Sequence, residues 1–381
     1  MFRKVAIIDP LGAHGSSHHF YIFGQSYGLK YNNVNVSIYT NSETHNPNID
    51  GVRFYQTFGN LFSNKLAIVI AIRYILGTIK SVFHARFRGV SVFHFHIFYN
   101  NFLVLFSCLI VKLLFGKLVL TVHDVESFAM GNRFMLKSSL LYKFSDLILT
   151  HNQFSKDEII KLAPNLKYKV HIIPHGNYIP FIKVSEDKKK SREYLALPSD
   201  KTVLLFFGMI KKVKGLDVLL ESFKKVVAEN SDVVLLIAGR PWQHDFDFYK
   251  KIIDKYHLAD NIILHTKFIE ENDVSHYYCA SDLVVLPYKR IYQSGVLIMT
   301  LSYIRPVLVS NLLPLKEIIV DNENGFLFKS EDVNDLAEKL KLILADKNNL
   351  ENVRKNGYNF IKDKYSWEKI GSLTKTAYQS L

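Results

Sequence analysis

Residues 202–239, TVLLFFGMIKKVKGLDVLLESFKKVVAENSDVVLLIAG, decide the fold class. The apolar run that ends at Gly208 predicts a buried strand, and the segment 216–229 has apolar residues at helical spacing on one side. A second apolar run, 233–239, predicts the next strand. Strands that alternate with helices in this way favour a parallel sheet with helices on both faces.

The same alternation extends over the whole chain. Further apolar runs predict strands at 5–9, 36–40, 92–98, 118–123, 147–151, 169–176, 262–268, 282–287 and 306–310. The stretch 183–201 is charged, has no apolar run and predicts a surface linker. We therefore expect an α/β protein of two Rossmann-like αβα domains, 1–182 and 202–360, facing a central cleft, with a C-terminal helix, 361–381, that can pack back on the N-terminal domain.

Composition limits the class of protein. The chain has 381 residues, of which 48% are apolar, so two cores are the expectation. Cys108 and Cys279 lie far apart without metal-ligand spacing, which favours core thiols in a reducing cytoplasm. The N-terminus lacks a signal-peptide pattern, and the longest apolar run, 102–115, is shorter than the ~20 residues that span a bilayer. No transmembrane segment is predicted.

Positive charge is concentrated in the first half of the chain. Residues 1–190 hold 22 Lys and Arg against 10 Asp and Glu, whereas residues 191–381 hold 26 against 25. Between Gly51 and Lys117 there are eight basic residues and no acidic one. This pattern favours an anionic membrane surface or an anionic substrate, with a merely solvated basic face as the alternative. No nucleic-acid recognition motif accompanies it.

Polar loops follow the predicted strands of the first half. The loop PLGAHGSSHHF carries Gly12 and Gly15, which allow backbone to approach a ligand, but it lacks the G-x-G-x-x-G dinucleotide pattern. TVHD places His123 and Asp124 at the carboxyl end of a parallel strand, where a His is able to donate to a sugar hydroxyl or a phosphate. His94 and His96 alternate along one strand and favour a core or supporting role.

Two loops of the second half are suited to an anion. After the strand that ends at Gly208, Lys211, Lys212 and Lys214 precede a helix that begins after Gly215, and mobile ammonium groups at such a junction suit a diphosphate. After the strand 282–287, QSGV (293–296) begins another helix, whose first N–H groups carry the positive end of the helix dipole. The two loops would converge on one nucleoside diphosphate.

At these loops the sequence resembles family 4 glycosyltransferases of the group 1 type, which have the GT-B fold. The matching segments are FGMIKKVKGLDVLLESF, DLVVLPYKRIYQSGVLIMTLSYIRPVLVSNLLPLKEIIVDNENGFLF, TVHD, PHGNY and YSWEKI. The resemblance implies transfer of a hexose from a UDP- or GDP-sugar to a saccharide acceptor linked to a polyprenyl diphosphate. It also implies a cytoplasmic enzyme, peripheral on the inner face of the cytoplasmic membrane, that acts in capsule, O-antigen, lipopolysaccharide or exopolysaccharide synthesis.

By the same resemblance, residues of both halves acquire expected roles. The expected catalytic residues are His123, Asp124, Lys211 and Lys214. The expected donor-binding residues are Gly15, Gly208, Gly215, Gln293, Ser294, Gly295, Val296 and Glu317.

The sequence departs from the family at the donor loop. Members often have two glutamates eight positions apart, and the aligned positions here are Tyr292 and Thr300; Met209 stands where Arg is usual. A subset of the family carries a similar QSGV loop without the pair. A catalytically silent partner of another transferase is therefore an alternative function. A nucleotide-sugar epimerase is a weaker one, because the cleft offers few carboxylates for acid/base chemistry.

Neither a metal nor another cofactor is expected, because basic side chains and helix dipoles neutralise the leaving diphosphate in GT-B enzymes. The only Asp-x-Asp, Asp245 and Asp247, falls where a helix begins and favours helix capping. The family usually retains the anomeric configuration, with the leaving phosphate taking the acceptor proton. If this chain inverts, Asp124 is the candidate base and Asp9 a weaker second.

Overall fold

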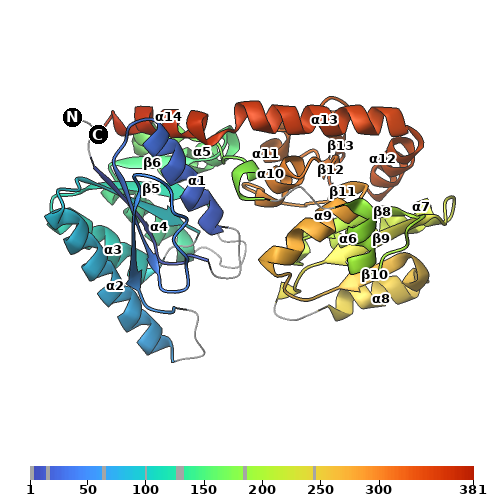
Figure 1. The fold of residues 1–381 in the computed structure, drawn as a ribbon, viewed down its shortest axis with the longest axis horizontal. Coiled ribbons are helices and arrows are strands. Elements are labelled where there is room, and N and C mark those ends of the chain that lie inside the picture. The colour runs from blue at the N-terminus through green and yellow to red at the C-terminus, as the bar shows by residue number, and fades with distance from the viewer. Residues whose placement is uncertain are drawn as a thin grey trace. The chain divides into compact units, whose positions relative to one another are not determined.

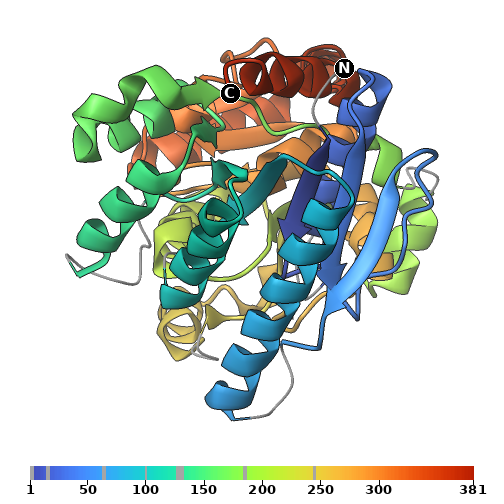
Figure 2. The ribbon, with the colours of Figure 1, turned by 90° about the vertical axis from the view of Figure 1, so that its left-hand side faces the viewer.

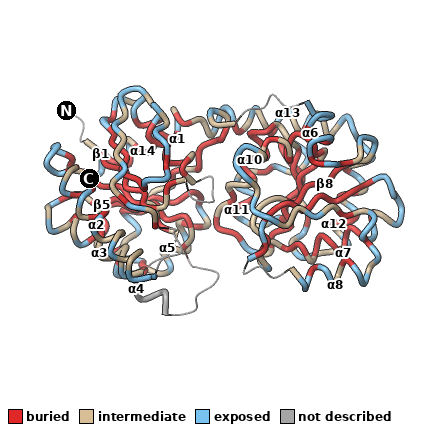
Figure 3. The backbone as a smooth tube through the Cα atoms, turned by 60° about the horizontal axis from the view of Figure 1, so that its bottom comes forward, coloured by how far each residue is buried: buried red, intermediate tan, exposed pale blue. Residues whose placement is uncertain are grey.

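The computed structural model describes residues 4–13, 18–61, 66–98, 101–125, 133–182, 187–242 and 246–381, with the side chains of 133–137 excluded. The chain forms two compact units (Figure 1). Unit 1 comprises Met1–Gly176 and Tyr365–Leu381, and unit 2 comprises Asn177–Lys364. Buried backbone is concentrated in the sheet of each unit, as Figure 3 shows.

Unit 1 is built on a parallel sheet with strand order β3-β2-β1-β4-β5-β6-β7. Its strands are β1 (Val5–Asp9), β2 (Val36–Asn41), β3 (Arg53–Phe58), β4 (Val92–Ile97), β5 (Lys117–Val122), β6 (Leu147–Thr150) and β7 (Val170–Ile172). Its helices are α1 (His18–Tyr31), α2 (Ala67–Phe87), α3 (Phe102–Leu113), α4 (Arg133–Phe144), α5 (Gln153–Leu162) and α14 (Trp367–Tyr378). Apolar residues of α2 and α3 pack with one face of the sheet in a single core.

Unit 2 has a second parallel sheet, in the order β10-β9-β8-β11-β12-β13. Its strands are β8 (Thr202–Phe207), β9 (Val233–Ala238), β10 (Ile262–His265), β11 (Leu283–Leu286), β12 (Val307–Ser310) and β13 (Phe326–Phe328). Its helices are α6 (Lys188–Tyr194), α7 (Leu216–Val227), α8 (Asp247–Lys255), α9 (Val274–Ala280), α10 (Gly295–Ser302), α11 (Leu313–Lys316), α12 (Val333–Ala345) and α13 (Lys347–Lys364).

The two sheets confirm the predicted α/β class, and each has one topological switch point. In unit 1 the chain leaves β1 toward β2 and leaves β4 toward β5, on opposite sides. In unit 2 the corresponding pair is β8 and β11. Ligands of open α/β sheets bind beyond the carboxyl ends of the strands at such points.

The expected surface linker, 183–201, differs from the structure. Residues 183–186 lie outside the described residues, and α6 follows them within unit 2. Arg192 of this helix is buried, donates to Ala280 O at 3.1 Å and pairs with Asp282 at 2.8 Å. A charged sequence therefore forms a docked helix, because its arginine is held by a carboxylate 90 residues away.

The C-terminal helix α14 belongs to unit 1 and packs on α1. Trp367 is 2% exposed, and a Cβ atom at Gly24 would lie 2.0 Å from its indole. A Cβ at Gly28 would lie 1.9 Å from Trp367 O, and one at Gly371 would meet Gly28 at 2.1 Å. The absence of side chains at these three glycines lets the two helices approach closely.

Three further features of the fold can be compared with the sequence predictions. Cys108 and Cys279 are free and buried, as expected of core thiols, and burial raises the pKa of Cys108 to about 12. The edge strands β3, whose Arg53 and Gln56 are exposed, and β13 were not predicted from the sequence. A helix was predicted at roughly 61–84, where α2 lies, but no membrane-length helix was; by length and composition alone α2 could cross a membrane.

Candidate functional site

The loop after β8 is shaped by two glycines with left-handed backbone. Gly208 has φ +103° and Gly215 has φ +68°. A Cβ at Gly215 would lie 1.8 Å from Pro287 O, so only glycine allows the loop to rest against the end of β11. Lys289 N donates to Val213 O at 2.9 Å, and Lys289 Nζ lies 2.6 Å from Asp217 of α7.

The loop after β11 leads into α10. Ser294 is buried and caps the helix, because its hydroxyl accepts the N–H of Leu297 at 3.1 Å. The N–H groups of Gly295 and Val296 belong to the first turn, which has no intrahelical acceptor. They remain suited to a bound anion.

These two loops meet at the switch point of unit 2. A Cβ at Gly208 would lie 3.5 Å from Val296 Cγ2, so the end of β8 lies beside the first turn of α10. The structure thus brings together the predicted residues of both loops. The loop after β9 joins them through the bridge between Ile210 and Pro241.

Both lysines assigned to a diphosphate lie against aromatic rings in this region. Lys214 Nζ lies 3.7 Å from the ring centre of Tyr288, and Lys211 Nζ lies 4.4 Å from that of Trp242. A ring face attracts an ammonium group without neutralising its charge. Each lysine is therefore held in place and still able to pair with a phosphate.

Other predicted donor residues differ in how they are placed. Gln293 Nε2 is buried and makes no hydrogen bond among the described residues, so it is a donor suited to a ligand. Glu317 ends α11 with an exposed side chain, and its role stays a prediction. At the positions of the family glutamates, Tyr292 is 1% exposed and Thr300 Oγ1 donates to Val296 O at 2.7 Å. Both side chains are part of the local packing.

In unit 1 the loop after β1 is held by buried polar groups. Asp9 is 2% exposed and accepts from Leu11 N and Gly12 N at 3.2 and 3.1 Å. Burial raises the pKa of Asp9 to about 6, and the two backbone hydrogen bonds partly offset that rise. Thr44 Oγ1 accepts from Ala13 N at 2.9 Å and would lie 2.0 Å from a Cβ at Gly12, which has φ +55°. Gly15 lies outside the described residues.

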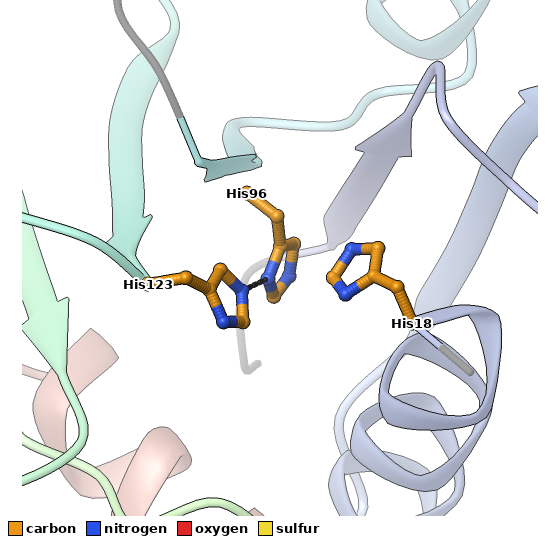
Figure 4. A group of neighbouring side chains, drawn as sticks. All are labelled: His18, His96 and His123. Atoms are coloured by element: carbon orange, nitrogen blue, oxygen red, sulfur yellow. Dashed lines mark hydrogen bonds between the residues drawn. The ribbon is translucent and has the colours of Figure 1, made fainter. Parts of the chain in front are cut away.

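A group of imidazoles lies at the other side of this switch point (Figure 4). His96 Nδ1 lies 3.0 Å from His123 Nε2, and His123 Nδ1 lies 3.0 Å from His151 Nε2. His151 Nδ1 lies 3.0 Å from Ile173 O, and His96 Nε2 lies 3.0 Å from the side-chain amide of Gln25. These contacts form one chain of hydrogen bonds across β4, β5 and β6.

Hydrogen-bond bookkeeping assigns the tautomers in this chain. Ile173 O only accepts, so His151 Nδ1 carries the proton; neutral rings then require Nδ1–H on His123 and on His96. His96 Nε2 is left as an acceptor, which requires an N–H from Gln25. The nitrogen and oxygen of a side-chain amide are assigned from such hydrogen-bond patterns. If the Gln25 oxygen faced His96, Gln25 Nε2 would be buried without a partner among the described residues. The pattern therefore points the Gln25 amide nitrogen at His96.

Burial keeps these imidazoles neutral, together with two rings beside them, His18 next to His123 and His175 next to His151. It lowers the pKa of His18 and His175 to about 3 and that of His151 to about 4, and it holds the pKa values of His96 and His123 well below the ordinary value. Neighbouring histidines add to the effect at four of these five rings. The group therefore has no net charge at pH 7.

The predicted role of His123 is changed by these contacts. Both ring nitrogens bond to other histidines, so a hydrogen bond from this ring to a sugar would require one of them to break. Asp124, the next residue, is partly exposed at the carboxyl end of β5. His18 at the start of α1 contacts His123 edge to face, with ring centres 5.1 Å apart.

The same rings are the candidate metal ligands in the described part of the chain. One nitrogen from each of His18, His96 and His123 lies within 4.8 Å of the others. A metal there would have to displace the hydrogen bond between His96 and His123, so the arrangement fits a hydrogen-bonded chain better than an ion. Of the Asp-x-Asp pair, Asp245 lies outside the described residues, and Asp247 lies in the first turn of α8, where Phe246 is the N-cap.

Sequence reasoning missed Gln25, His18 and His151 as members of this group. Gln25 lies within α1, His18 opens it, and His151 follows β6. The signal available was positional, since His123 and His151 are each the last residue of a predicted strand of one parallel sheet.

Comparison with known proteins agrees with this geometry. The family described as Glycosyl transferases group 1 matches residues 187–360. CapM of Staphylococcus aureus, a capsular polysaccharide biosynthesis glycosyltransferase, is 25% identical over 268 residues, 68% of each chain. The glycosyltransferase MJ1069 of Methanocaldococcus jannaschii is 23% identical over 366 residues, 94% of this chain and 87% of its own.

A solved structure extends the likeness to the whole fold. HepE of Anabaena, in complex with UDP and glucose, covers all of both chains with a TM-score of 0.76 at 15% identity. The segment 187–360 therefore belongs to the group 1 glycosyltransferases, and the chain is a glycosyltransferase with the GT-B fold.

Proposed function

We propose that the enzyme transfers a hexose from a UDP- or GDP-sugar to a lipid-linked saccharide in the synthesis of a surface polysaccharide. The observation that carries the donor assignment is the closeness of Gly208 to Val296, which places the start of the lysine-bearing loop beside the first turn of α10. Support for the polysaccharide class comes from the likeness to CapM, and support for a uridine nucleotide from the likeness to HepE.

In this proposal the second unit holds the leaving diphosphate. Lys211, Lys214 and the N–H groups of Gly295 and Val296 offset its negative charge, which is an electrostatic form of catalysis that requires no metal. The bond from the anomeric carbon to the diphosphate oxygen breaks, and a bond to the acceptor oxygen forms. The acceptor proton passes to the leaving phosphate, and the anomeric configuration is retained.

In unit 1 we assign positioning roles around the transferred sugar. His123 and Asp124 stand at the carboxyl end of β5, beside the switch point. The hydrogen-bonded imidazoles fix the His123 ring. Asp124 is then the group that accepts a hydrogen bond from a sugar hydroxyl. If the product is inverted, Asp124 becomes the candidate base.

The donor assignment is tested by thermal-shift titration of the full chain with UDP, GDP, ADP and their sugars, in the presence of EDTA. One nucleotide is expected to raise the melting temperature with concentration. Lys214→Ala is expected to lower the affinity for that nucleotide by about 10- to 100-fold, since a hydrogen bond to a charged group contributes about 1.5–3 kcal/mol. Lys211→Ala is expected to act in the same direction.

The matched control is Lys212→Ala, because Lys212 is exposed in the same loop and should leave the affinity unchanged. Equal binding by all variants would contradict the cradle. Transfer of radiolabelled sugar to a membrane lipid extract, and not to the free saccharide, tests the acceptor. Nucleotide binding without transfer to any acceptor would favour the silent-partner function instead.

A further inference from the structure

Helix α2 carries apolar residues on its outer side as well as on the side that packs in the core. Its buried face consists of Gly77, Thr78, Ser81, Val82 and Ala85, which are mostly small or hydroxylic. The large side chains Ile68, Ile72, Leu76, Phe83 and Phe87 are 40–86% exposed. At 100° per residue these five lie within about a third of a turn, so they form one stripe along the outer side.

Helix α3 continues this surface. Phe102, Leu109 and Leu113 are 71%, 39% and 72% exposed and recur at spacings of seven and four, again one stripe. Phe115, directly after the helix, is 90% exposed. Inward, α3 turns Ser107, whose hydroxyl lies 3.2 Å from that of Thr78. Figure 2 shows the two helices side by side on one face of the sheet. We name these nine outward residues the α2–α3 stripe.

Such a pattern is unfavourable in water. Apolar side chains are normally turned toward the core, and an apolar surface of neighbouring large residues marks an interaction site. Here one hydroxyl pair, Thr78 and Ser107, lies within an inner contact that is otherwise apolar, and isoleucine, leucine and phenylalanine also face outward. Transfer of these side chains from water into an apolar phase that covers the stripe has a favourable free energy.

Charge identifies what covers it. The segment from Gly51 to Lys117 has eight basic residues and no acidic one. Lys80 lies within the stripe, and Arg86 and Arg88 lie at its end; none of the three has a carboxylate within 4.0 Å in the described part of the chain. Two copies of this chain would bring like charges together. An anionic lipid headgroup layer over an apolar interior matches both the charge and the apolar residues.

We propose that the α2–α3 stripe inserts into the interfacial layer of an anionic membrane. Helix α2 lies in the plane of that layer and does not cross it, because its other face packs on the sheet of unit 1 with Val82 and Ala85 in the core. The exposed apolar residues and basic charge of the stripe are independent of the sugar-transfer assignment. Its purpose rests on the proposed lipid-linked acceptor, which a membrane-docked unit 1 would meet at the headgroup layer.

The test is cosedimentation of the full chain with vesicles of phosphatidylcholine alone and of phosphatidylcholine with phosphatidylglycerol at 3:1. The wild type is expected to bind the anionic vesicles, less tightly at 0.5 M NaCl. The variant Ile68→Ser/Ile72→Ser/Leu76→Ser should bind them at least about tenfold more weakly, since each side chain loses its transfer into the interface. The matched control is Leu264→Ser/Leu342→Ser/Leu373→Ser, three exposed leucines elsewhere, which should bind as the wild type does.

Circular dichroism melting checks whether the stripe variant is folded, and its nucleotide-dependent thermal shift should equal that of the wild type. The shift can fail while vesicle binding succeeds, so the donor assignment and this proposal are tested separately. A wild type that stays in the supernatant, or a stripe variant that binds equally well, would overturn the proposal. A lipid-free dimer that the stripe variant converts to monomer would overturn it in favour of self-association.

Discussion

His96 Nδ1 lies 3.0 Å from His123 Nε2, and this contact links the last residues of β4 to the residue that follows β5. Neutral rings allow it only if His96 donates and His123 accepts. The direction is set at a distance, by Ile173 O at one end of the chain and the Gln25 amide at the other. Selective 15N NMR of histidine at pH 7.5 should show His96, His123 and His151 as neutral Nδ1–H tautomers.

Gln25→Glu should change the number of protons carried by the hydrogen-bonded imidazoles. A carboxylate at position 25 only accepts, so both ends of the chain would then demand a proton from an imidazole. Three neutral rings supply three protons for four hydrogen bonds, and we expect one imidazolium at pH 7.5, visible in the 15N shifts. Gln379→Glu, at an exposed position, should leave the spectrum unchanged. A wild-type His123 that carries its proton on Nε2 would refute the assignment.

Unit 1 should be acid-labile because of its buried histidines. His18, His94, His96, His123, His151 and His175 all have pKa values lowered by burial. The stability contributed by a lowered histidine pKa is present above the unfolded value of 6.5 and is lost as the pH falls below it. Each ring that stays neutral in the folded protein costs up to about 1.4 kcal/mol per pH unit once the pH is well below 6.5, so the group should cost several kcal/mol per unit.

Asp9 acts in the opposite direction. Its pKa is raised from 3.8 to about 6, so its stabilising contribution is complete below pH 3.8 and is lost as the pH rises through 6. Below pH 6 it offsets about one histidine, and the net effect stays a loss of several kcal/mol per pH unit. Urea midpoints should fall steeply between pH 6.5 and 5.5, and His45→Gln at an exposed position should not alter the profile. Equal midpoints at pH 7.5 and 5.5 would show that the rings are not buried as neutral groups.

Gly215→Ala should cost far more stability than a positive φ alone explains. Its φ of +68° carries a left-handed penalty of about 1–2 kcal/mol, and the new Cβ would also lie 1.8 Å from Pro287 O. Gly89→Ala is the matched control, because Gly89 has φ +77° but its Cβ would lie no closer than 3.5 Å to Lys4 Nζ. Urea unfolding should give about 1–2 kcal/mol for Gly89→Ala and several kcal/mol for Gly215→Ala. Similar losses would mean that the loop moves away from β11 without cost.

The loops of unit 2 were predictable from sequence because their signal is local. An apolar strand, a glycine and a helix with one apolar side follow each other directly around Gly208 and Gly215, and strand order then places this loop beside the one that contains Gly295. The closeness of Gly208 to Val296 follows from the parallel sheet, since β8 and β11 are neighbours.

The chain of imidazoles was not predictable in the same way. Its members are Gln25 of α1 and one histidine at or after each of β4, β5 and β6. They lie far apart in the sequence, so no local motif contains them together. The buried face of α2 could not be predicted from the sequence either, because apolar residues occur on all sides of this helix. Thr78 and Ser81 are buried, although polar residues usually lie on the outer side of an amphipathic helix. Arg192 of α6 depends on Asp282, a partner 90 residues away.

Trp367→Ala should destabilise unit 1 by about 3–5 kcal/mol, the usual cost of removing a buried tryptophan. The indole is 2% exposed, lies against Gly24 and Gly176 and contacts the ring of Tyr21 edge to face, with centres 5.3 Å apart. Leu373→Ala, on the same helix, removes a side chain that is 46% exposed and should cost no more than about 0.5 kcal/mol. Urea unfolding of the two full-length variants measures the difference. Equal small losses would show that α14 lies on α1 without closing its core, and the helix could then be removed without unfolding unit 1.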